Sequence, residues 1–161
     1  MNKFLLAFAL LTCIGMQLQA QTITISGDGI AVPVLITKSM LAEPRQAVVM
    51  AKAHDEKVHR YSGVPVANLL AKAGLLLGDT AKRATIKTYV VITAADNYKV
   101  IFALPEIDPL FANRTIILAD RADKKALPAE DGPFQIIVPG EKKHARWIRQ
   151  VTSIQVVKLN I

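Results

Sequence analysis

One segment decides the fold expected for this chain: Tyr61-Ser62-Gly63-Val64-Pro65-Val66-Ala67-Asn68-Leu69-Leu70-Ala71-Lys72-Ala73-Gly74. Pro65 suits the first position of a helix that runs to Ala73, because its fixed φ angle is already helical. Four apolar residues follow at i, i+3, i+4 and i+7 and form one face: Val66, Leu69, Leu70 and Ala73. Gly74 supplies the C-terminal stop. We expect Gly63 to need a positive φ angle in a turn before Pro65.

Around this helix the chain has mainly the pattern of β-strands. Apolar or alternating runs predict strands at 22–26, 31–36, 46–53, 58–61, 86–94, 98–103, 115–119, 134–138 and 151–157. Short helices are predicted at 38–42 and 105–112. Trp147 should be buried against the strands. The chain lacks an internal repeat and a flexible linker, so the prediction is one α+β domain over 21–161, with a mixed, mostly-β core.

The first 20 residues have the features of a secretory signal peptide. A positive charge at Lys3 precedes an apolar run over Phe4–Ile14, and a small residue, Ala20, precedes polar Gln21. We expect cleavage after Ala20 and an exported protein, periplasmic or secreted. A lipoprotein signal ending at Cys13 is the alternative. The apolar run is too short for a membrane-spanning helix, which predicts a protein that is not transmembrane.

Composition narrows the possible functions further. The 161 residues suffice for one domain that folds without disulfides or a structural metal. The single cysteine, Cys13, lies in the predicted leader, so the mature domain would have no disulfide, zinc–thiolate site or cysteine nucleophile. The formal net charge is +7, but acidic residues are interspersed with the basic ones. This pattern favours solubility over nucleic-acid binding, and no aromatic residues interleave the charges.

Two groups of residues are candidates for binding chemistry. The densest charge cluster surrounds the only tryptophan and could bind an anion, with the Arg146 guanidinium as a planar fork; it comprises Lys142, Lys143, His144, Arg146 and Arg149. A solvated loop is the alternative. His54 and His59 flank a polar hairpin loop and could hold a divalent metal together with a neighbouring carboxylate. Two ordinary surface histidines are the alternative there.

Catalytic motifs are otherwise absent. The chain has no G-x-S-x-G elbow, P-loop, G-x-G-x-x-G or H-E-x-x-H sequence. Glu106 and Asp108 could form a catalytic carboxylate pair. Pro105 and Pro109 bracket them, however, and acidic residues are favoured in a first helical turn by the helix dipole, so we expect a capping role.

Four pieces of the chain, in order, resemble the sulfite-oxidase-like molybdopterin-binding domain family. The opening segment resembles its Y-x-G-V-P-L-x-D-L-L-x-x-A-G element. The second and third pieces, 94–98 and 105–108, resemble A-x-D-G-Y and [PA]-E-[IL]-D. The fourth, 132–140 followed by 146–149, resembles G-P-L-R-L-V-V-P-G and K-W-[VIL]. The resemblance covers about residues 22–160 and implies an α+β fold that cradles a pyranopterin, with a cysteine thiolate on molybdenum.

This chain departs from the family pattern at the positions that bind the cofactor. The resemblance places the catalytic cysteine within Val48–Glu56, which contains none. Glu130 and Gln135 stand where the enzymes carry His and Arg, so two positive partners of the cofactor are replaced. Arg146 matches the basic residue before the family's tryptophan and is the anion contact that the resemblance retains.

Three functional hypotheses follow. The first is an exported domain without molybdenum redox catalysis, which binds an unidentified small ligand or protein partner and carries no cofactor. The second is a molybdopterin-dependent oxidoreductase component that still holds the pterin through Arg146, Lys143 and His144. The third is a divalent-metal module using His54 and His59. Whether the chain is an enzyme stays open at this point, because the family is catalytic but the molybdenum-ligating cysteine is absent.

Overall fold

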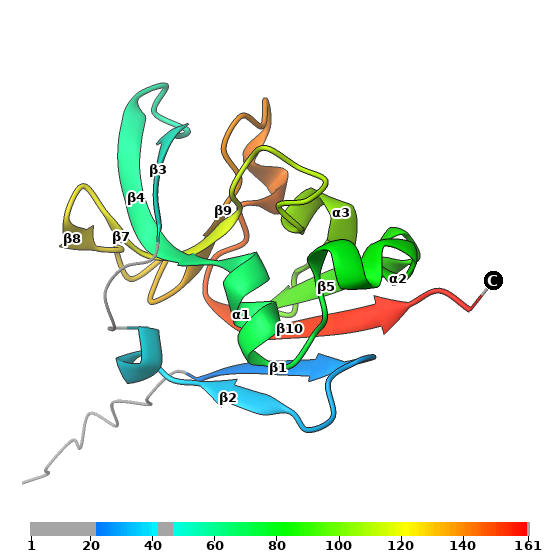
Figure 1. Cartoon of the computed structure of the whole chain (residues 1–161). Helices are drawn as coiled ribbons and strands as arrows, with labels where there is room; N and C mark the ends of the chain where they lie inside the picture. Colours follow the sequence, from blue (N-terminus) through cyan, green and yellow to red (C-terminus); the bar gives the residue numbers. More distant parts are fainter. Residues whose placement is uncertain (1–21, 42–46, 161) are drawn as a thin grey trace, which may run out of the picture.

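The computed structural model describes residues 22–41 and 47–160, whose strands form two five-stranded sheets (Figure 1). The first sheet has the order β2 (Val34–Ile36), β1 (Ile23–Gly27), β10 (Val151–Lys158), β5 (Thr88–Ala94) and β6 (Lys99–Ala103). The second contains β3 (Ala47–Lys52), β4 (Val58–Pro65), β7 (Ile117–Ala122) and β8 (Lys125–Ala126), with β9 (Gln135–Ile137) also paired to β7. The predicted leader lies outside the described residues.

Short helices connect and cover the strands. The α-helices are α1 (Val66–Lys72), α2 (Lys82–Ile86) and α3 (Leu104–Ile107), and the 3₁₀ turns are η1 (Ser39–Leu41), η2 (Gly78–Ala81) and η3 (His144–Arg146). Within residues 22–41 and 47–160, no helix has the length and apolar character needed to cross a membrane. The predicted α+β fold with a mostly-β core is confirmed.

Alternation of side chains along the strands builds the core. In β5 every second residue is buried, as expected for a strand with one face toward the interior. The first and last strands, β1 and β10, pair in parallel, whereas the other neighbours in this sheet are antiparallel. Trp147 is 6% exposed and belongs to the same apolar core, which confirms its predicted burial.

The opening segment folds largely as its sequence predicts. Helix α1 buries one apolar face, comprising Val66, Ala67, Leu69 and Leu70. Gly74 follows with a φ angle of 94°, and the Leu75 N–H donates to the carbonyl oxygen of Leu70 at 3.0 Å, so the helix ends at a glycine stop. Pro65 is the N-cap residue and also the last residue of β4.

Gly63 corrects our prediction of a positive-φ turn. It lies inside β4, opposite Ala119 of β7, and its φ angle is outside the left-handed region. The strand pairing shifts register between Ser62 and Gly63, which marks a β-bulge. A Cβ atom at position 63 would lie 2.0 Å from the Leu118 carbonyl oxygen, so glycine is required by close strand approach.

Several predicted element boundaries are also wrong. Three strands differ from their predicted ranges: 31–36 begins at Val34, 58–61 extends to Pro65, and 115–119 spans Ile117–Ala122. The strand expected at 86–94 begins at Thr88, because Ile86 ends helix α2, where the buried Thr85 hydroxyl donates to the Ala81 carbonyl oxygen at 3.1 Å. The helix expected at 105–112 ends at Ile107, because Pro109 disfavours a helical conformation at the residue before it. The described part of the helix expected at 38–42 is the single turn η1.

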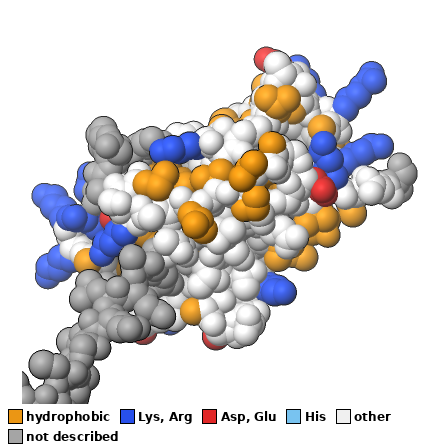
Figure 2. Space-filling model, turned by 90° about the horizontal axis from the view of Figure 1, so that it is seen from below, with side chains coloured by type: hydrophobic (Ala, Val, Ile, Leu, Met, Phe, Trp, Pro, Cys, Tyr) orange, Lys and Arg blue, Asp and Glu red, His pale blue; other side chains and the backbone are white. Residues whose placement is uncertain are grey.

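One face of the molecule, seen from the β1–β2 side, carries a stripe of apolar side chains (Figure 2). Leu35 on β2 is 58% exposed and Val32, just before this strand, is 71% exposed. Lys and Arg side chains lie toward both ends of the same view (Figure 2). The basic charge is therefore spread on this face and does not form a single patch.

Candidate functional site

Five aromatic rings form a continuous row beside the β3–β4 hairpin. In spatial order the row contains His59, Tyr61, Trp147, His144 and His54. Successive ring centroids lie 6.3, 5.6, 4.3 and 4.4 Å apart, and neighbouring rings meet edge to face, as aromatic quadrupoles favour. All three histidines of the chain belong to this aromatic row.

Strand geometry explains how the row is assembled. His59 and Tyr61 are two residues apart in β4, so their side chains lie on the same face of the strand. The indole N–H of Trp147 donates to the Val138 carbonyl oxygen at 3.1 Å, which fixes the central ring.

Tyr61 has a hydroxyl pKa above the ordinary value. The main cause is the burial of its side chain, and nearby carboxylates raise the pKa further. Tyr61 is therefore neutral at physiological pH.

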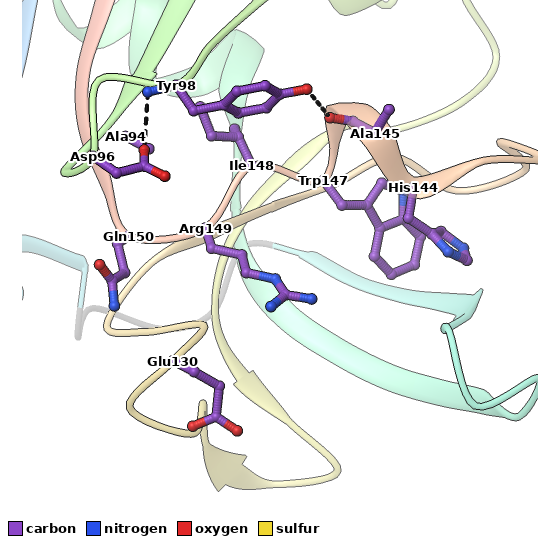
Figure 3. Close-up of a pocket in the computed structure, with 10 residues that line it drawn as sticks. All are labelled: Ala94, Asp96, Tyr98, Glu130, His144, Ala145, Trp147, Ile148, Arg149 and Gln150. Carbon is purple, nitrogen blue, oxygen red and sulfur yellow. Dashed lines mark hydrogen bonds between the residues drawn. The ribbon is translucent and has the colours of Figure 1, made fainter.

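A cleft of about 370 Å³ opens beside the row (Figure 3). Its lining, which defines the Trp147 cleft, comprises Ala94, Asp96, Tyr98, Glu130, His144, Ala145, Trp147, Ile148, Arg149 and Gln150. The Tyr98 hydroxyl donates to the Ala145 carbonyl oxygen at 3.1 Å, and the Tyr98 N–H donates to Asp96 at 2.9 Å (Figure 3). The first bond ties the β5–β6 turn to the η3 segment, and the second holds the turn itself, so two walls of the cleft are held together.

The cleft presents charges of both signs. Arg149 is half exposed, and its Nε lies 2.9 Å from Asp131 Oδ1. Glu130 and Arg149 reach the cleft from different loops (Figure 3). The Gln150 amide nitrogen donates to the Ala129 carbonyl oxygen at 3.1 Å, which ties these loops together. The arrangement suits a polar ligand that has both hydrogen-bond donors and acceptors.

Arg146, the anion contact inferred from the sequence, does not line this cleft. Its Nη1 and Nη2 donate to the Glu106 oxygens at 3.2 and 2.9 Å, and its Nε donates to Glu141 at 2.8 Å. The guanidinium carbon also lies 4.4 Å from the centroid of the Phe102 ring. An anionic ligand would therefore have to compete with two carboxylates already bound to this guanidinium.

Other members of the basic cluster have different positions. Lys143 is exposed immediately before η3, and His144 belongs to both the aromatic row and the Trp147 cleft. Of the predicted cluster, the structure thus brings His144 and Arg149 into the cleft. Anion binding by Lys143, His144 and Arg146 stays a prediction.

The two histidines of the predicted metal site have separate partners. His54 Nδ1 lies 3.4 Å from His144 Nδ1. His59 lies between two carboxylates, with Nδ1 2.6 Å from Asp123 and Nε2 3.1 Å from Asp55. The predicted pairing across the hairpin is wrong, because the β7–β8 turn supplies Asp123 to His59. Among the residues that the structure describes, no group of three or more His, Cys, Asp and Glu side chains is placed to hold a metal ion.

The environment of His59 predicts a measurable titration. Hydrogen bonds that the His59 ring donates to Asp123 and, second, to Asp55 raise the pKa of His59 above its ordinary value. The imidazolium form is therefore stabilised in the folded state, and its contribution to stability is complete below about pH 6.5 and is lost as the pH rises through the higher folded-state pKa. We expect an NMR titration of the His59 ring to show an elevated midpoint.

Two variants check the cause of that shift. Asp123→Asn should lower the His59 midpoint more than Asp55→Asn, because the bond to Asp123 has the larger effect. An unchanged midpoint in Asp123→Asn would contradict the assignment.

The acidic pair considered as catalytic carboxylates has structural roles instead. The Glu106 carboxylate accepts the Ala103 N–H at 3.1 Å, which caps helix α3 as predicted. Asp108 is fully buried and accepts the N–H groups of Gly78 and Leu110 at 2.8 and 2.9 Å. These carboxylates are thus satisfied by groups of the protein itself.

The residues present do not fit a molybdenum cofactor held by a protein thiolate. The stretch to which the resemblance assigns the cysteine, Val48–Glu56, forms β3 and the β3–β4 turn, and it presents His54 beside His144. Imidazole is a harder donor than the thiolate that the resemblance implies. The matched guanidinium, Arg146, is held by Glu106 and Glu141. The scaffold around the site is retained, whereas this donor set is not.

Sequence reasoning missed two residues that shape the site. Tyr98 was noted only as part of a family motif, although its hydroxyl bonds η3. Glu141 has no recognisable signal in the sequence, because its hydrogen bond with Arg146 depends on the conformation of the loop between them.

Comparison with known proteins identifies the family. The family model described as the oxidoreductase molybdopterin binding domain matches residues 11–160. A comparison with curated proteins found no match. The match spans nearly the whole chain, and the α+β structure with two sheets is consistent with it. The chain therefore belongs to the oxidoreductase molybdopterin-binding domain family.

Proposed function

We propose that this domain is an exported, non-redox member of the family that binds a small polar ligand in the Trp147 cleft. The observation that carries the proposal is the combination of a cleft beside Trp147 with a donor set that does not fit a molybdenum thiolate site. The stretch Val48–Glu56 has no thiolate, and the guanidinium of Arg146 is already bound by two carboxylates. Export rests on the leader-like residues 1–20.

The chemistry of the cleft defines the class of ligand. A volume of about 370 Å³ is in the range of small-molecule sites. The indole of Trp147 offers an aromatic edge, Arg149 and His144 offer donors, and Glu130 offers an acceptor. A planar heterocycle with polar edges, such as a pterin without its metal, matches these groups. A protein partner is the alternative occupant, and a cleft that binds no pterin would leave that alternative.

The test begins with the full chain, produced with its own leader in a host that makes molybdenum cofactor. We expect molybdenum below one tenth of the protein concentration. Near-stoichiometric molybdenum together with pterin would instead establish the second candidate, a cofactor-bearing oxidoreductase component, which family membership favours.

The cleft itself is tested with 6-carboxypterin as the probe. Trp147 is the only tryptophan, so its fluorescence should change on titration. Arg149→Ala should weaken the interaction about tenfold, which corresponds to about 1.4 kcal/mol. The matched control Arg83→Ala alters an exposed arginine on α2, away from the cleft, and should leave the affinity unchanged. Equal affinity in both variants, or no fluorescence change, would count against a pterin-like ligand in this cleft.

A further inference from the structure

The pair His54 and His144 stands apart from the other polar contacts of the site. Their Nδ1 atoms lie 3.4 Å apart, although the residues are 90 positions apart in the chain. This separation is long for a hydrogen bond, for which about 2.7–3.2 Å is typical. Neither ring has a carboxylate partner of the kind that holds His59.

The separation of the two nitrogens matches a different chemistry. Zinc binds imidazole nitrogens at about 2.0–2.1 Å in tetrahedral geometry, so two such ligands lie about 3.3–3.4 Å from each other. The two Nδ1 atoms of His54 and His144 therefore already have the spacing of one edge of a zinc tetrahedron.

Neighbouring residues restrict where the rings can lie. His144 packs edge to face on Trp147, with centroids 4.3 Å apart, and Trp147 is fixed by its bond to Val138. His54 lies in the β3–β4 turn, next to the acidic side chains of Asp55 and Glu56, whose charge favours a nearby cation. These two carboxylates bond His59 and Lys52, respectively. The protein thus offers two imidazole nitrogens, from His54 and His144, as ligands for one metal ion.

We propose that His54 and His144 form a binding site for a divalent late transition metal, zinc in the first instance, at the edge of the Trp147 cleft. Each histidine contributes Nδ1, and water fills the remaining two positions. The absence of a third protein ligand among the described residues makes this an open site, which an exogenous ligand in the cleft can approach because His144 lines both. The proposal does not depend on which ligand occupies the cleft.

The experiment is a calorimetric titration of the full chain, without a polyhistidine tag, with zinc chloride. We expect one zinc per chain. His54→Ala and His144→Ala should each weaken zinc binding at least tenfold. The double variant should have the same zinc affinity as either single variant, because the loss of one nitrogen already abolishes chelation. His59→Ala is the matched control and should stay within twofold of wild type, because its ring is held by Asp55 and Asp123.

Three outcomes would overturn the proposal: no zinc binding by the wild type, unchanged binding in His54→Ala, or an equal loss in His59→Ala. The last result would favour a site around His59 in its place. His54 is exposed, so its alanine variant keeps the test valid even if His144→Ala disturbs the packing of Trp147. Circular dichroism of each variant verifies folding. As a second measurement, the visible spectrum of the cobalt-loaded protein should show tetrahedral bands that disappear in His54→Ala.

Discussion

Replacing Gly63 with alanine is expected to lower the free energy of unfolding by roughly 3 kcal/mol or more. The added Cβ atom would lie 2.0 Å from the Leu118 carbonyl oxygen and 2.6 Å from the Ala119 Cα atom. Both are backbone atoms of β7, so no side chain can rotate to make room. Strands β4 and β7 would have to separate in the middle of the second sheet. Urea unfolding followed by Trp147 fluorescence measures the loss.

Gly140→Ala is the matched control for this prediction. Gly140 has a φ angle of 81°, and a Cβ atom there would meet nothing within 4 Å. Its replacement should cost only the left-handed backbone strain of about 1–2 kcal/mol. If Gly63→Ala were no more destabilising than Gly140→Ala, the steric explanation for Gly63 would be wrong.

The second large effect is expected at Arg146. Its side chain is 29% exposed and is bonded by Glu106, which is 30% exposed, and by Glu141, which is 13% exposed. Arg146→Met keeps most of the apolar stem over Phe102 but leaves both carboxylates without this cation. We expect a loss of about 2–3 kcal/mol in the free energy of unfolding, less than for a fully buried pair because solvent screens part of the interaction. Chemical denaturation measures it.

The pH dependence separates the charge effect from lost packing. Burial acts to raise the pKa of Glu106, but hydrogen bonds from Arg146 and from the Ala103 N–H outweigh it, and the net pKa lies below the ordinary value. The stabilisation is therefore present above about pH 4.3 and is lost as the pH falls through the lower folded-state pKa. The difference between wild type and Arg146→Met should narrow in that acidic range. A difference that is constant with pH would indicate lost packing alone.

Arg149→Met serves as the control at a neighbouring arginine. Its side chain is 50% exposed and pairs with Asp131 near the surface. The expected change is about 0.5 kcal/mol, because exposed ion pairs contribute little. An equal loss in the two variants would contradict the special role given to Arg146.

Local signals in the sequence predicted part of this structure. The apolar spacing before Gly74 predicted α1, and alternating residues predicted β5 and β10 within a few positions. These features depend on neighbours in the chain. Helix α2 was missed because Lys82–Ile86 is a single turn with little apolar periodicity, and one buried threonine bond stabilises it.

The site was harder to predict, since its contacts join distant parts of the chain. Arg146 meets Glu106 across 40 positions, and His144 meets His54 across 90. Residue types alone predicted an anion-binding arginine and a hairpin histidine pair. The tertiary fold neutralises that arginine with carboxylates and gives each histidine a different partner. Such pairings depend on how two sheets are placed together, about which short-range patterns carry no information.

The parallel pairing of β1 with β10 also has a consequence for the order of folding. β10 lies between β1 and β5, so the central strand of the first sheet is formed by residues 151–158, far along the chain from β1 at residues 23–27. Without β10, β1 and β2 cannot be joined to β5 and β6. The first sheet is therefore completed through contacts of high sequence separation, which slow folding.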